Sequence, residues 1–286
     1  MGHQWSWGIT GYEVSEKDNA EIIELCRYAG VASVEANRQF VDDKSTEEIQ
    51  EIREQYEQAS LSVGSFHLPF GSDFDIADFY ETRRKKHVDG ILEYMEKASL
   101  LGSRVCILHP SASEFDVKEE GMDRYMRCMG KSLEVLLPRA EDLGVKIALE
   151  NMLPGEVGVG GRFGSEPEHF ELFTREFVHP NLGYCLDTGH AQVVVGADGP
   201  GRFFDVMKDR LIAFHLQDNP GDRDLHLAPG HGLVDWNTVF KRMSDIKYPH
   251  PAVIEAPPFS RGLHKNYGRD AWKNMIDRME GLVDDA

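Results

Sequence analysis

The chain has 286 residues, of which 41% are apolar, so it can bury the core of two ordinary domains or of one large α/β barrel. Its 31 lysines and arginines stand against 49 aspartates and glutamates, a net charge of −18 that disfavours nucleic acid and anionic membranes as partners. No signal segment opens the chain and no window approaches the ~18 apolar residues of a membrane span, so a soluble, cytoplasmic protein is expected. The four cysteines lack the spacing of a zinc knot or disulfide framework and are expected to be free thiols.

Short apolar, β-branched runs recur along the chain and predict eight strands. They cover residues 6–9, 31–36, 61–66, 103–108, 145–149, 182–186, 211–216 and 252–256. Segments with helical spacing lie between them, at residues 16–30, 45–59, 78–101, 121–143, 167–177, 202–210, 236–246 and 270–283. Several of these helical segments end in glycine, which closes a helix by adopting the left-handed conformation.

This alternation of strands and helices is typical of parallel βαβ units, and eight units in one chain favour a (β/α)8 TIM barrel of the α/β class. An open doubly wound sheet is the alternative fold. No linker rich in proline or serine divides the sequence, so residues 1–286 are predicted to form a single domain. The glycine-rich segment 155–164 lacks the spacing of a dinucleotide-binding loop and is predicted to be a flexible active-site loop.

Polar side chains stand at the carboxyl ends of the last six predicted strands, where a TIM barrel places its active site. Each residue by itself has a simpler explanation as a helix cap, a water-facing residue or a hydrogen-bonded histidine. It is harder to explain as caps or water-facing residues why six consecutive strands all end in histidine, aspartate or glutamate. Independent caps would include serine, threonine and asparagine as well. The residues are His67, His109, Glu150, Asp187 with His190, His215 with Asp218, and Glu255, while Asp224 and His226 follow in the loop after the seventh strand.

Three carboxylates on one rim would repel one another and lose solvation unless a divalent cation lay between them. Oxygen ligands with one imidazole suit Mn²⁺, Mg²⁺ or Co²⁺ in an octahedral site that leaves positions open for substrate oxygens. The predicted metal ligands are therefore Glu150, Asp187, His215 and Glu255, with one Mn²⁺ as the expected ion.

Five motifs resemble those of the xylose-isomerase-like TIM-barrel superfamily in order and spacing, and the resemblance covers nearly the whole chain. They are LEN at 149–151, CLDTGHA at 185–191, FHLQD at 214–218, DxHxxPGxG at 224–232 and EAP at 255–257. In the isomerase and epimerase branch, the resemblance implies one metal on the four predicted ligands, with the two glutamates as the acid/base pair.

The reaction that this resemblance implies is the isomerisation or epimerisation of a ketose or keto-sugar, with a small carbohydrate as the partner. A metal that chelates a carbonyl and the adjacent hydroxyl acidifies the C–H between them and stabilises the enediolate. Glu150 and Glu255 on opposite sides would remove a proton from one face and return it at the other. His190 is predicted to contact a substrate hydroxyl or oxyanion, and the resemblance gives substrate contacts to His67, His109, Asp224, His226 and Arg223. For Arg223, a solvated loop residue is an equal alternative.

Endonuclease IV belongs to the same superfamily and is the main alternative. Its three zinc ions have nine ligands, and this chain matches all of them with His67, His109, Glu150, Asp187, His190, His215, Asp224, His226 and Glu255. The loops after these strands are acidic and poor in the basic and wedge residues that hold an opened duplex, which favours the sugar reaction. A lyase or dehydratase acting on a keto-sugar, a barrel that binds without turnover, and a homo-oligomer all stay open.

Overall fold

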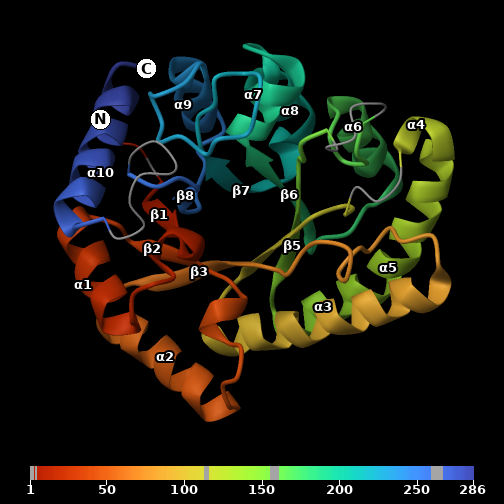
Figure 1. The fold of residues 1–286 in the computed structure, drawn as a ribbon, viewed down its shortest axis with the longest axis horizontal. Coiled ribbons are helices and arrows are strands. Elements are labelled where there is room, and N and C mark those ends of the chain that lie inside the picture. Colours follow the sequence, from red (N-terminus) through yellow and green to blue (C-terminus); the bar gives the residue numbers. More distant parts are fainter. Residues whose placement is uncertain (1–2, 4, 113–115, 155–160, 259–266) are drawn as a thin grey trace.

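Eight parallel strands form a closed barrel in the order of the sequence in the computed structural model, which describes residues 3, 5–112, 116–154, 161–258 and 267–286. The barrel closes where the first strand, red in Figure 1, pairs with the last strand, which is blue. In this pairing Trp7 lies opposite Ala252. All eight predicted strands are confirmed, which excludes the open doubly wound sheet. They are β1 Trp7–Thr10, β2 Ser33–Ala36, β3 Ser62–His67, β4 Val105–Leu108, β5 Lys146–Glu150, β6 Leu182–Asp187, β7 Leu211–Leu216 and β8 Ala252–Ile254.

Helices surround the barrel and cover the outer faces of its strands (Figure 1). They are α1 Asn19–Ala29, α2 Thr46–Gln58, α3 Glu81–Leu101, α4 Val117–Glu120, α5 Met122–Leu143, α6 Pro167–Glu176, α7 Thr188–Val195, α8 Gly199–Met207, α9 Trp236–Asp245 and α10 Arg269–Asp284, with short 3-10 turns η1 Gly11–Val14, η2 Arg38–Phe40 and η3 Lys208–Arg210. None of the helices in the described ranges has the length and apolar composition needed to cross a membrane.

Two helices, α4 and α7, lie in segments where the spacing of apolar residues predicted none. The sequence of α7, TGHAQVVV, has only eight residues and no polar face, so its pattern has no helical period. Its start is nevertheless encoded locally, because Asp187 accepts a hydrogen bond from the backbone N–H of His190 and caps the helix.

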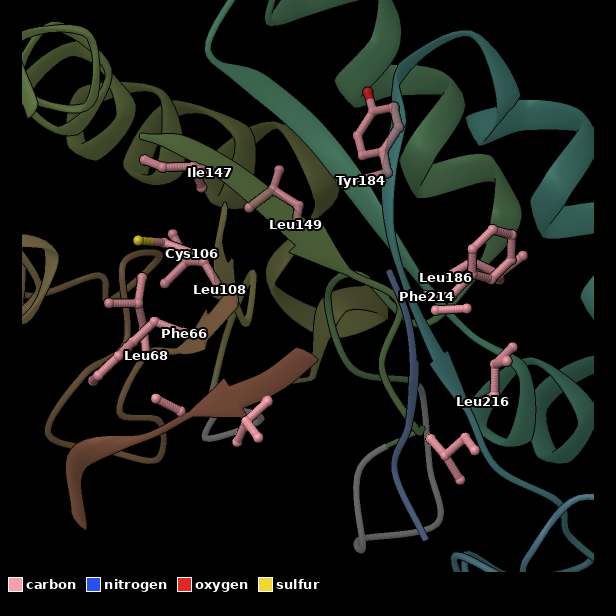
Figure 2. Packing of buried hydrophobic residues seen from close by; sticks show 14 of the residues in the cluster. Phe66, Leu68, Cys106, Leu108, Ile147, Leu149, Tyr184, Leu186, Phe214 and Leu216 are labelled. Carbon is pink, nitrogen blue, oxygen red and sulfur yellow. The ribbon is translucent and has the colours of Figure 1, made fainter. Parts of the chain in front are cut away.

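Alternate residues of each strand face opposite sides of the barrel wall. The outward-facing residues form the main core against the helices, and Figure 2 shows those of β3 to β7. A small inner cluster fills the barrel and consists of Val105, Ile107, Ala148, Cys185 and Ala213. Two residues further along the same strands, and thus on the same inner face, Glu150 follows Ala148, Asp187 follows Cys185 and His215 follows Ala213. The strand period therefore stacks these polar side chains directly on an apolar floor.

The four cysteines are free thiols, as predicted.

Candidate metal centre and active site

A cavity of about 440 Å³ lies at the carboxyl ends of the strands, the rim at which TIM barrels carry their active sites. Seven of the predicted site residues line it: His67, His109, Glu150, His190, Asp224, His226 and Glu255. Asp187 and His215 are fully buried at the ends of β6 and β7. Residues from widely separated parts of the chain thus meet at one rim.

Glu150, Asp187, His215 and Glu255 converge on one point. Each offers one potential ligand atom, and these atoms lie within 4.8 Å of one another. The Nδ1 atom of His215 lies 3.0 Å from Glu150 Oε1 and 3.0 Å from Glu255 Oε2. The barrel register brings the residues together, because Asp187 pairs with His215 across β6 and β7. The predicted ligand set is therefore assembled in space, while its role in metal binding stays a prediction.

The chemistry of this cluster fits a divalent cation. Burial raises the pKa of Asp187, and the carboxylates of Glu255 and Glu150 raise it further, although His190 opposes them. The Oε2 atoms of Glu150 and Glu255 are buried and lie 3.1 Å from His109 Nε2 and 3.0 Å from His215 Nδ1, respectively. Three buried carboxylates this close together repel one another and have lost their hydration, and a cation between them relieves both costs. Three carboxylates and one imidazole form a donor set suited to Mn²⁺, Mg²⁺ or Co²⁺.

Asp187 is at once a helix cap and a member of this cluster. Its Oδ1 atom accepts the backbone N–H of His190 at 2.6 Å, and Gln217 Nε2 donates to both carboxylate oxygens, at 3.1 and 3.2 Å. The Asn151 side chain bonds both the N–H and the carbonyl of Asp187, at 2.8 and 2.9 Å. The simple explanation of Asp187 as a cap and its predicted role in the site are therefore compatible.

Three histidines of the cavity are oriented by backbone carbonyl groups. The Nδ1 atoms of His67, His190 and His226 lie 2.9, 2.9 and 2.8 Å from the carbonyl oxygens of Leu68, Asn151 and Glu255, respectively. A carbonyl oxygen only accepts hydrogen bonds, so Nδ1 carries the proton in each ring. The Nε2 atoms face carboxylates of the site: that of His67 lies 3.6 Å from Glu150 Oε2, and those of His190 and His226 lie 3.8 and 3.1 Å from Asp224 Oδ2.

Among the described residues, three further groups have the spacing of metal ligands. They are His67 with His109 and Glu150, His67 with His215 and Glu255, and His190 with Asp224 and His226. The Nε2 atom of His109 lies 3.1 Å from Glu150 Oε2, and that of His226 lies 3.1 Å from Asp224 Oδ2. The nine residues that match the ligands of endonuclease IV are thus all within this one region.

Arg223 is the predicted site residue that the structure places elsewhere. Its side chain is 66% exposed and pairs with the neighbouring Asp222, and it does not line the cavity. A short loop ion pair holds the guanidinium at the surface, as in the solvated alternative. The predicted contact of Arg223 with substrate has no support in this geometry.

Three residues of the site were missed by the sequence analysis. Tyr12 and Arg162 line the cavity, and Glu35 on β2 contacts His215 from below. Phe70, near His67 in the sequence, also lines the cavity. Glu35 had a detectable signal, because it is the one charged residue within the apolar run of residues 31–36. Residues 155–160 of the predicted flexible loop at 155–164 lie outside the described part of the chain. Arg162 belongs to the part of this loop that the structure describes.

The chain belongs to the xylose isomerase-like TIM barrel family, whose sequence profile matches residues 23–284. It is 30% identical over 222 residues to an uncharacterized protein of Methanocaldococcus jannaschii, covering 76% of this chain and 70% of that protein. It is 26% identical over 208 residues to a probable endonuclease 4 of Oceanobacillus iheyensis, covering 66% of this chain and 65% of that protein.

Two solved structures share the fold over nearly the full length. A D-tagatose 3-epimerase-like protein has 24% identity and a TM-score of 0.77, with 98% of both chains covered. An L-ribulose 3-epimerase has 14% identity and a TM-score of 0.81, with 98% of this chain and 95% of that chain covered. At these identities the likeness shows the fold, and the activity has to be argued from the site.

Proposed function

We propose that this protein is a divalent-metal-dependent isomerase or epimerase of a ketose or keto-sugar. The observation that carries the proposal is the convergence of Glu150 and Glu255 on the four-residue centre, next to a cavity suited to a small polyhydroxylated substrate. Oε1 of Glu150 and Oε2 of Glu255 each lie 3.0 Å from His215 Nδ1.

Glu150, Asp187, His215 and Glu255 would hold the ion, with Mn²⁺ as the first candidate and Mg²⁺ or Co²⁺ as alternatives. When bound, such an ion polarises a chelated carbonyl and neutralises negative charge that develops on the substrate oxygens. One glutamate would accept the proton from the substrate carbon, and the other would donate a proton to the opposite face.

The remaining cavity residues would bind and orient the sugar. A backbone carbonyl holds Nδ1 of His190, His67 and His226, so Nε2 of each ring is directed toward the interior of the site. Nε2 of His67 and His190 would bind substrate hydroxyl groups, and His226 would act together with Asp224, which lies 3.1 Å from its Nε2. Phe70 and Tyr12 pack edge-on around the His67 ring and supply an aromatic wall for the apolar face of a sugar.

A trinuclear zinc endonuclease acting at abasic DNA sites is the second candidate, favoured because all nine matching residues belong to groups with metal-ligand spacing. The charge of the cavity opposes it. Among the described lining residues, Arg162 is the only lysine or arginine, whereas Glu13, Glu150, Asp224 and Glu255 are acidic. A nuclease needs basic groups for the DNA phosphates. A lyase or dehydratase on a keto-sugar would use the same centre as the isomerase.

The metal content of the protein, purified without added metal or chelator, separates these candidates. Mass spectrometry is expected to find about one Mn²⁺, Co²⁺ or Mg²⁺ per chain. Ketoses and keto-sugars incubated with this protein in D₂O should then exchange a carbon-bound proton, which NMR detects. Three zinc ions per chain together with cleavage of an abasic oligonucleotide would establish the nuclease instead. Metal binding without exchange or cleavage would indicate a barrel that binds without turnover.

A further inference from the structure

Glu35 is a buried carboxylate that reaches the metal centre without lining the cavity. It lies on β2 and is 1% exposed. Its Oε1 atom lies 3.0 Å from Nε2 of His215, and its Oε2 atom accepts a hydrogen bond from Ser65 Oγ at 2.8 Å. The strands β2 and β7 are not neighbours in the barrel, so the contact between Glu35 and His215 crosses the barrel interior.

The two nitrogens of His215 face different groups. Nδ1 points to the carboxylates of Glu150 and Glu255, whereas Nε2 points to Glu35. This is the reverse of His67, His190 and His226, in which a backbone carbonyl holds Nδ1. His215 lies on β7, whose backbone pairs with β6 and β8. The acceptor that faces Nε2 of this ring is a side chain, the carboxylate of Glu35.

We infer that Glu35 is a positioning residue that fixes His215 with a proton on Nε2 and the lone pair of Nδ1 directed at the metal. The inference rests on the proposed metal centre. An imidazole ligand must present an unprotonated nitrogen, and the hydrogen bond of its other nitrogen decides which one that is. An ionised carboxylate only accepts hydrogen bonds, so the Glu35 carboxylate requires the proton on Nε2.

Ser65 completes this arrangement from the neighbouring strand β3. Its hydroxyl donates to Glu35 Oε2, and the register places Ser65 opposite Glu35. The same Oε2 atom accepts the hydrogen bond from His215 Nε2 at 3.2 Å, so Ser65 fixes the oxygen to which the histidine donates. The burial of Glu35 also excludes water, which would otherwise compete for the Nε2 proton of His215.

The test is the affinity of the metal-free protein for Mn²⁺, measured by isothermal titration calorimetry. Glu35→Ala is expected to weaken binding by roughly 10- to 100-fold, the usual effect of losing the carboxylate partner of a ligand histidine. Glu35→Gln should restore part of the affinity, because its amide oxygen can still accept from Nε2–H. Ser65→Ala should weaken binding less than Glu35→Ala, since the carboxylate itself remains.

A matched control is Asp78→Asn, which converts another buried carboxylate to an amide outside the cavity. This variant should bind Mn²⁺ as the wild type does. Thermal unfolding of the metal-free proteins checks that each variant is folded. A second readout is the Nε2–H proton of His215, observed by NMR in ¹⁵N-histidine-labelled protein loaded with Zn²⁺. Glu35→Ala should make this proton exchange faster with solvent. Glu35→Gln should keep it protected, because the amide oxygen still accepts the hydrogen bond.

Wild-type Mn²⁺ affinity in a folded Glu35→Ala variant, with a slowly exchanging Nε2–H, would overturn the inference and leave the metal centre intact. A wild-type protein that binds no divalent ion would overturn the proposed function, and this inference with it. The two failures are therefore distinguished by the behaviour of the wild type.

Discussion

Glu150 and Glu255 occupy equivalent places beside His215, so the same substitution tests both. Glu150→Gln and Glu255→Gln keep the volume of the side chain but remove the group that takes up a proton. Each change is expected to lower the rate of proton exchange by about 10³-fold, within the range for loss of a general base. The metal-free variants should stay folded, because the amide removes a buried charge from a crowded cluster.

The exposed Glu134→Gln is the matched control and should exchange protons at the wild-type rate. Rates are compared by NMR in D₂O, and folding by thermal unfolding. A wild-type rate in either active-site variant would show that the two-glutamate mechanism is wrong.

His169 gives a prediction on pH that is independent of the metal centre. It is buried near the start of α6, and its Nδ1 accepts the backbone N–H groups of Gly164 at 3.0 Å and Glu166 at 3.3 Å. Burial lowers the pKa of His169 to about 4, below the ~6.5 of an unfolded histidine. Because the unfolded chain binds the proton more readily, the stabilisation is complete above pH 6.5 and is lost as the pH falls toward 4.

Between pH 7 and pH 5, this linkage removes about 2 kcal/mol from the free energy of unfolding. His169→Asn keeps an acceptor that does not titrate, so the variant should lose about 2 kcal/mol less than the wild type over this range. Urea unfolding of both metal-free proteins at the two pH values measures the difference. Equal losses in the two proteins would contradict a neutral, buried His169.

At the scale of the element, Asp218 ties the loop after β7 to the barrel. Its buried carboxylate accepts the backbone N–H groups of Asn219, Val234 and Gly230 and the indole N–H of Trp236, at 2.9 to 3.0 Å. The loop between these anchors contains Asp224 and His226. Asp218, which the sequence indicated only as a strand-end residue, therefore supports the cavity without lining it.

Asp218→Asn places an amide NH₂ group against two N–H donors. The free energy of unfolding is expected to fall by about 3 kcal/mol, because hydrogen bonds to a buried charged group are replaced by facing donors. The loop carries two of the proposed substrate contacts and none of the four proposed metal ligands, so KM for a ketose substrate should rise while Mn²⁺ affinity changes little. Urea unfolding, kinetics and calorimetry measure the three quantities. Unchanged stability would refute the role of Asp218 as an anchor.

At the scale of the whole molecule, the proposed ion would join β5, β6, β7 and the residue after β8. Free Mn²⁺ at 100 times its Kd should stabilise the folded protein by about 2.7 kcal/mol. For a chain of this size, that corresponds to a rise in melting temperature of roughly 5 to 10 °C over the chelated protein. Glu150→Gln should lose most of the rise. Equal melting temperatures with Mn²⁺ and with chelator would argue against a metal in the barrel.

The barrel and most of its rim can be predicted from local sequence patterns. Strands and helices are encoded by local periods of apolar residues, so all eight strands were predictable in order and within a few residues. The strand period of two also places Glu150, Asp187 and His215 on the inner face above small apolar residues. Glu255 follows β8 directly, and the end of each strand marks the rim of the fold.

Contacts between these groups depend on how the strands and loops pack in three dimensions. Glu35 and His215 are 180 positions apart on strands that are not neighbours, and no local pattern indicates that their side chains meet across the barrel. The surface position of Arg223 depends on its ion pair with Asp222 and on the path of one loop, which composition does not specify. Local periodicity reports the face on which a side chain lies. Distances between side chains depend on barrel closure and loop packing, which long-range contacts determine.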